Sequence, residues 1–62
     1  MAMRKGDVVT LTIETVAFGG EGIGRVENLV VFVPFTAEGD VAEVEIREAK
    51  KRFLRGRVRK LI

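Results

Sequence analysis

The chain has 62 residues, of which 47% are hydrophobic and 32% are charged, and its formal net charge is +2. This length predicts one domain, residues 1–62, that buries only about 60% of its unfolded surface and has little room for an enclosed active site. Cys and His are absent, which excludes disulfides, the usual zinc sites and catalysis by a thiol or an imidazole. No segment resembles a signal peptide or a membrane span, so we expect a soluble cytoplasmic protein that does not bind membranes.

The first predicted strand covers residues 7–17. Apolar and polar side chains alternate from Val9 to Glu14, which is typical of a strand with one buried face. Residues 18–25 (Phe-Gly-Gly-Glu-Gly-Ile-Gly-Arg) contain four of the seven glycines, and this density predicts a barrel corner with a bend or bulge. A short second strand is expected at residues 21–26. It precedes a tight turn at Glu27 and Asn28, because Asn tolerates a positive φ.

Three further strands are predicted after this turn. The strand at residues 29–33 is apolar at odd and even positions alike, so both of its faces are apolar, and Pro34 ends it. Residues 40–47 alternate after a turn at 36–39 and have one wet face. Residues 53–61 form the fifth strand, in which Gly56 suits a bend, whereas it would weaken a helix by roughly 1 kcal/mol. Five short strands without a long helix predict an all-β fold, a closed antiparallel barrel that leaves no exposed sheet edge.

The charge is distributed unevenly along the chain. Residues 1–46 contain three basic and eight acidic side chains, a net charge of −5, whereas residues 47–62 contain eight basic and one acidic, a net charge of +7. Such asymmetry is typical of proteins that bind polyanions, because Lys and Arg neutralise phosphates. The alternative is a solvated face paired with the neighbouring acidic strands.

The sequence contains no recognisable motif for catalysis or for cofactor binding. The glycine spacing fits neither the dinucleotide fingerprint nor a phosphate-binding loop. Glu43 and Glu45 share a wet strand face, where nothing raises a carboxyl pKa, and no base is available to activate a hydroxyl. We therefore predict no catalytic residue, no metal site and no cofactor in this chain.

The four phenylalanines are the only aromatic residues. Phe53 shares its parity with three arginines, a pattern typical of single-strand binders in which the ring stacks on a base and guanidinium groups hold phosphates. The alternative is that Phe53 closes the core. Phe32 is interpreted as a core residue, because apolar strand residues are mostly interior, whereas Phe18 opens the glycine corner and Phe35 follows Pro34.

Several motifs together resemble the TRAM domain: Lys5-Gly6-Asp7, Ile13-Glu14, the glycine cluster from Phe18 to Arg25, Val31-Phe32-Val33-Pro34, Gly39 and Lys50-Lys51. The resemblance extends from about residue 4 to the end of the chain. It implies a small five-stranded, antiparallel OB-fold-like barrel that binds RNA, either ribosomal or transfer RNA. The candidate RNA-binding residues are Lys50, Lys51, Arg52, Phe53, Arg55, Arg57 and Arg59, with Phe18 and Arg25 at the glycine corner as a second surface.

The resemblance is greatest to TRAM domains at the N-terminus of ribosomal RNA uracil-C5 methyltransferases. It implies a monomeric RNA-recognition module without turnover of its own, whose parent enzyme uses S-adenosylmethionine in a separate catalytic domain. One alternative is a stand-alone RNA chaperone of the archaeal type. Another is an SH3-like protein-interaction barrel, although the chain has no Tyr or Trp to line such a groove.

Overall fold

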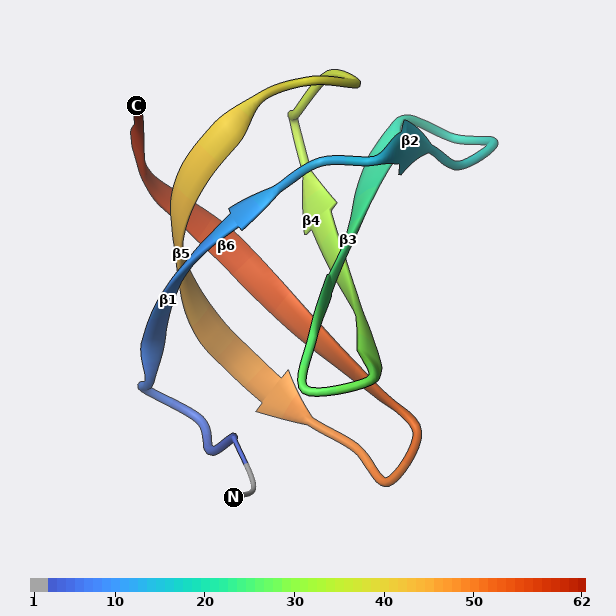
Figure 1. The fold of residues 1–62 in the computed structure, drawn as a ribbon. Helices are drawn as coiled ribbons and strands as arrows, with labels where there is room; N and C mark the ends of the chain where they lie inside the picture. Colours follow the sequence, from blue (N-terminus) through green and yellow to red (C-terminus); the bar gives the residue numbers. More distant parts are fainter. Residues whose placement is uncertain (1–2) are drawn as a thin grey trace.

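The computed structural model describes residues 3–62, which form six strands in one curled sheet (Figure 1). The strands are β1 (Val8–Thr12), β2 (Thr15–Val16), β3 (Glu21–Val26), β4 (Leu29–Pro34), β5 (Val41–Ala49) and β6 (Phe53–Leu61). The all-β, OB-like fold class predicted from the sequence is confirmed. Across residues 3–62, no helix has the length and apolar character needed to span a bilayer.

The strand predicted at residues 7–17 is divided into β1 and β2, which explains why there are six strands and not five. β1 pairs with β5, and β2 pairs with β3 after a bend at Ile13 and Glu14. Ile13 N–H donates to the Asp40 carbonyl at 2.7 Å, and Glu14 N–H donates to the Ile23 carbonyl at 2.8 Å. The sheet order is β1-β5-β6-β4-β3-β2, so β1 and β2 are its two edge strands. Because they are consecutive parts of one bent segment, this segment joins the two edges of the sheet.

One ladder differs from the predicted antiparallel arrangement. β4 and β6 are parallel and pair only from Val30↔Phe53 to Phe32↔Arg55. The chain reverses direction twice between them, in the turn after β4 and in the β5–β6 hairpin, so both strands run the same way (Figure 1). This short parallel ladder ends where β4 reaches Pro34, which has no N–H to donate.

The core is entirely aliphatic. Its buried residues are Leu11, Ile13, Val31, Val33, Ala42, Val44, Ile46 and Leu54. No phenylalanine belongs to this cluster or to the partly buried hydrophobic residues packed against it. A domain of this size has few large apolar side chains, so the location of all four rings outside the core is informative about function.

Glycines permit close packing in β6 and form the turns that the sequence predicted. A Cβ on Gly56 would collide with the buried Val44 side chain, so only glycine fits there. Glu27 and Asn28 have φ values of 52° and 66°, which form the expected tight turn between β3 and β4. Gly19 and Gly20 have positive φ in the β2–β3 turn, consistent with the predicted corner.

Candidate nucleic-acid interface

Two of the four phenylalanines lie together on the outer face of the barrel. Phe32 on β4 and Phe53 on β6 are half-buried, and their ring centroids are 5.7 Å apart at an interplanar angle of 77°. The interpretation of Phe32 as a core residue is therefore wrong: Val31 and Val33 face the core and Phe32 faces outward. Phe53 likewise points away from the core, because Leu54 and Gly56 take the inward positions of β6.

The Arg55 guanidinium completes this aromatic pair. Its central carbon lies 5.7 Å from the Phe32 ring centroid and 5.5 Å from the Phe53 ring centroid. The parallel ladder produces this contact by pairing Phe32 directly with Arg55, two residues beyond Phe53. We name Phe32, Phe53 and Arg55 the aromatic platform. Rings on an outer face beside a guanidinium plane are what single-strand binders use to stack bases.

Two carboxylates hold Arg55 in this position. One guanidinium nitrogen donates to Glu21 Oε2 at 3.2 Å, and Nε lies 3.6 Å from Glu48 Oε1. These pairs are about half exposed, so each contributes little to stability. Their effect is to orient the guanidinium over the rings and to offset its charge, which makes Arg55 better suited to stacking than to phosphate binding.

Arg25 lies on the same outer face as the aromatic platform. It pairs across the sheet with Val30, which in turn pairs with Phe53, so one row across β3, β4 and β6 connects them. The Arg25 Nε is 3.9 Å from Glu14 Oε1. The structure thus brings together Arg25 and Phe53, which the sequence had assigned to two different surfaces.

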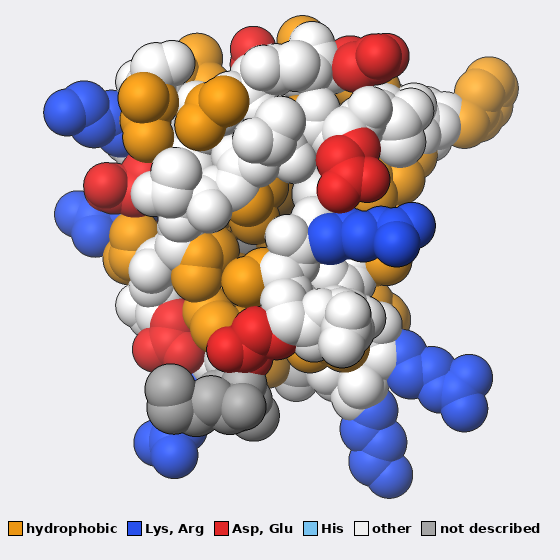
Figure 2. Space-filling view, viewed as in Figure 1, with side chains coloured by type: hydrophobic (Ala, Val, Ile, Leu, Met, Phe, Trp, Pro, Cys, Tyr) orange, Lys and Arg blue, Asp and Glu red, His pale blue; other side chains and the backbone are white. Residues whose placement is uncertain are grey.

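Phe18 is separate from the aromatic platform. It lies in the β2–β3 turn with its side chain fully exposed, and Figure 2 shows a hydrophobic group projecting from that hairpin. No cation–π contact to Phe18 occurs among residues 3–62. The second predicted surface, Phe18 with Arg25, is therefore not a single cluster.

The basic turn, residues 50–52, adjoins the platform at the start of β6. Lys50 Nζ is 3.3 Å from Glu48 Oε2, whereas Lys51 and Arg52 have no carboxylate partner in the described part of the chain. Figure 2 shows Lys and Arg side chains projecting from the end of the molecule that carries this hairpin. The basic turn therefore directly precedes Phe53 in the chain. Of its three side chains, those of Lys51 and Arg52 are available for a ligand.

Arg57 and Arg59 continue along β6 but do not lie on one regular face. Arg57 alternates with the inward Gly56 and Val58. Beyond Val58 the register shifts, since Val44 pairs with Val58 and Glu43 with Lys60, so Arg59 is the extra residue of a β-bulge. Neither arginine has an ion-pair partner within residues 3–62. Both are exposed cations farther along the strand that carries Phe53 and Arg55.

Among residues 3–62, no polar or charged side chain is buried, and no group of three or more acidic side chains could hold a metal ion. The outer face carries aromatic rings and exposed cations, which are the two kinds of group that bind a single nucleic-acid strand.

The model of the TRAM domain family matches residues 3–58. This chain is a TRAM domain. The match spans all six strands except the last residues of β6, and it includes the platform and the basic turn.

Relatives include both a small protein and much longer enzymes. An uncharacterized protein of Methanocaldococcus jannaschii is 45% identical over 51 residues, which are 82% of this chain and 66% of that protein. An uncharacterized RNA methyltransferase of Corynebacterium glutamicum is 42% identical over 59 residues, 95% of this chain but 14% of the enzyme. Ribosomal RNA large subunit methyltransferase E of Haloarcula marismortui is 43% identical over 51 residues, 82% of this chain and 19% of the enzyme. This TRAM domain thus spans a small fraction of the methyltransferases it matches.

A solved structure has the same fold. The solution structure of a conserved protein from Methanococcus maripaludis superposes with a TM-score of 0.83 at 34% identity, covering 90% of this chain and 80% of that one. The OB-like barrel is therefore shared with a protein that is only slightly longer than this TRAM domain.

Proposed function

We propose that this TRAM domain binds single-stranded RNA along the outer face of β3, β4 and β6. The observation that carries the proposal is the placement of Phe32 and Phe53 outside the core, in contact with the guanidinium of Arg55. Bases stack on the platform, and phosphates pair with the unpaired cations around it, Lys51, Arg52, Arg57 and Arg59. Stacking and phosphate contacts are both tolerant of sequence, so we expect a modest sequence preference.

The RNA methyltransferase relatives support a more specific role. We infer that the domain serves as the N-terminal RNA-recognition module of an S-adenosylmethionine-dependent uracil-C5 methyltransferase that acts on ribosomal RNA in the cytoplasm. The relatives from C. glutamicum and H. marismortui support this role by their names as RNA methyltransferases. In such an enzyme the methyl donor and the catalytic residues belong to another domain, and this domain positions the RNA.

A stand-alone RNA chaperone is the second candidate. The observation that favours it is that this TRAM domain covers 66% and 80% of two small archaeal proteins. The coding sequence after Ile62 distinguishes the two roles: an S-adenosylmethionine-binding domain supports the methyltransferase, and a nearby stop codon supports the chaperone. Both roles require the same RNA-binding surface.

The basic test is binding of the 62-residue chain to a fluorescein-labelled oligouridylate about eight nucleotides long, a length within the ~4–16 nucleotides that an OB fold covers. Fluorescence anisotropy measures the affinity between 50 and 200 mM salt. Each phosphate contact contributes roughly −0.7 to the slope of log affinity against log salt. Affinity that falls with salt supports the proposal. Absence of binding at 50 mM salt contradicts it.

We expect the Arg57→Ala variant to reduce the salt dependence of binding. Four unpaired cations predict a slope of log affinity against log salt of about −3, and the loss of one makes it shallower by about 0.7. All RNA sequences should weaken to a similar extent, because a phosphate contact reads no base. The matched control is Arg4→Ala, which removes the same charge outside the proposed surface and should leave the slope unchanged. An unchanged slope in Arg57→Ala would exclude this phosphate contact.

A further inference from the structure

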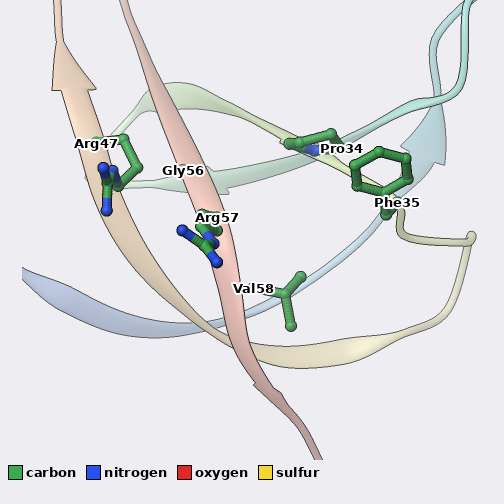
Figure 3. A pocket seen from close by; sticks show the side chains of 6 residues that line it. All are labelled: Pro34, Phe35, Arg47, Gly56, Arg57 and Val58. Carbon is green, nitrogen blue, oxygen red and sulfur yellow. The ribbon is translucent and has the colours of Figure 1, made fainter.

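An open cavity of about 580 Å³ lies where β4 and β6 diverge. Its lining residues come from the end of β4, from β5 and from β6: Pro34, Phe35, Arg47, Gly56, Arg57 and Val58. Figure 3 shows the two arginines on the β5 side of β6, and Pro34, Phe35 and Val58 on the other side. The volume falls within the roughly 300–1,000 Å³ that is typical of small-molecule sites.

Local sequence explains why the barrel is open at this point. The β4–β6 ladder ends at Phe32↔Arg55, and Pro34 cannot donate the next hydrogen bond. Phe35 then turns the chain away with a φ of 63°. Gly56 lines the opening with its backbone alone, since a Cβ at this position would point into the core against Val44.

The polar part of the lining is purely cationic. Among residues 3–62, no acidic side chain lines the cavity. Arg57 has no carboxylate partner among residues 3–62, and Arg47 has one distant pair, 3.8 Å to Glu45 on its own strand. The register shifts between Ile46 and Glu48, so Arg47 is the extra residue of a β-bulge, a feature that redirects side chains beside binding sites. The cavity therefore favours a ligand that carries a negative charge.

Phe35 occupies a turn position whose backbone conformation is unfavourable for a bulky side chain. A left-handed φ is disfavoured for a bulky residue, and the Phe35 ring is 97% exposed, so it does not contribute to the core. Gly or Asn would fit the same turn without strain. Strain of this kind concentrates at ligand sites, and here it places an aromatic ring on the rim of a cationic cavity.

We propose that this cavity receives one nucleobase of the bound RNA, which packs against Pro34 and Phe35 while Arg47 and Arg57 hold the adjoining phosphate. The inference rests on the proposed function, because the same strand must also pass over the platform. Phe35 follows Phe32 by three residues, about 10 Å of extended chain at ~3.3 Å per residue. A second base site at that distance makes the aromatic platform and the cavity successive contacts of one strand.

The first test is NMR of the isotopically labelled chain with the same oligouridylate. We expect intermolecular nuclear Overhauser effects between uracil protons and both the Phe35 ring and the Val58 methyl groups. Inorganic phosphate is the comparison ligand, and it should shift the arginine signals without affecting the Phe35 ring. If phosphate alone reproduces all the changes, the cavity is only an anion site and the inference is overturned. It is also overturned if the RNA contacts Phe53 but leaves Phe35 unperturbed.

Variants at Phe35 provide the second test. Phe35→Gly removes the ring in a conformation that glycine adopts readily, so we expect an unchanged or higher Tm together with RNA affinity about 5- to 150-fold lower. Phe35→Tyr preserves the ring and should bind as the parent does. Equal affinity in Phe35→Gly and the parent overturns the cavity site, whereas failure of the parent to bind the oligouridylate contradicts the proposed function itself.

Discussion

We expect the Phe53→Ala variant to bind single-stranded RNA about 5- to 150-fold more weakly than the parent, which corresponds to the loss of one base–aromatic stack worth roughly 1–3 kcal/mol. Phe53 contacts both other members of the platform, since its ring packs edge-on against Phe32 and lies 5.5 Å below the Arg55 guanidinium carbon. Truncation therefore removes one stacking surface and exposes the other to rearrangement. Fluorescence anisotropy with the labelled oligouridylate gives the affinity.

Phe53→Ala should remain folded, which separates binding from folding, although it should be less stable than the parent. The half-buried ring loses its packed apolar area and, beyond that area, an aromatic pair worth about 0.5–1.5 kcal/mol. Circular dichroism and thermal unfolding verify that the variant is folded. Phe18→Ala provides the competing result: if it weakens binding and Phe53→Ala does not, RNA binds at the β2–β3 hairpin and not on the platform.

Local patterns in the sequence predicted most of the strands correctly. β3 and β6 occupy the predicted ranges 21–26 and 53–61, and β5 extends the predicted 40–47 by two residues to Ala49. The turn at Glu27 and Asn28 also forms as expected. These elements depend on neighbouring residues, so local patterns contain the information needed to find them.

The composition of the site could not be predicted in the same way. β4 is apolar on both parities, so periodicity could not decide that Phe32 faces outward. Glu21 and Glu48 hold Arg55, but Glu21 is 34 residues away in the sequence and meets Arg55 only through the β3–β4–β6 arrangement. The two bulges, at Arg47 and Arg59, arise from the register between β5 and β6, which alternation alone does not specify.

The fold itself should be most sensitive to its few large core side chains. Ile46 is fully buried at the centre of β5, where its amide donates to the Asp7 carbonyl and its carbonyl accepts from Gly6, both at 2.7 Å. The core has eight buried aliphatic residues and no ring to compensate for a lost side chain. If Ile46 is truncated, few neighbouring side chains are therefore large enough to move into the cavity that it leaves.

We expect Ile46→Ala to lower the free energy of unfolding by about 2–5 kcal/mol, the usual cost of such a truncation in a core. At about 0.05–0.15 kcal/mol per residue, a domain of this size has a total stability of roughly 3–9 kcal/mol, so the variant should be close to unfolding at 25 °C. Thermal unfolding should show Tm lower by about 10–40 °C. Ile62→Ala is the matched control, since the same atoms are removed from a side chain that is 72% exposed, and its Tm should equal that of the parent. A loss below about 1 kcal/mol in Ile46→Ala would show that the core repacks around the vacancy, against the expectation that a close-packed interior relaxes only in part.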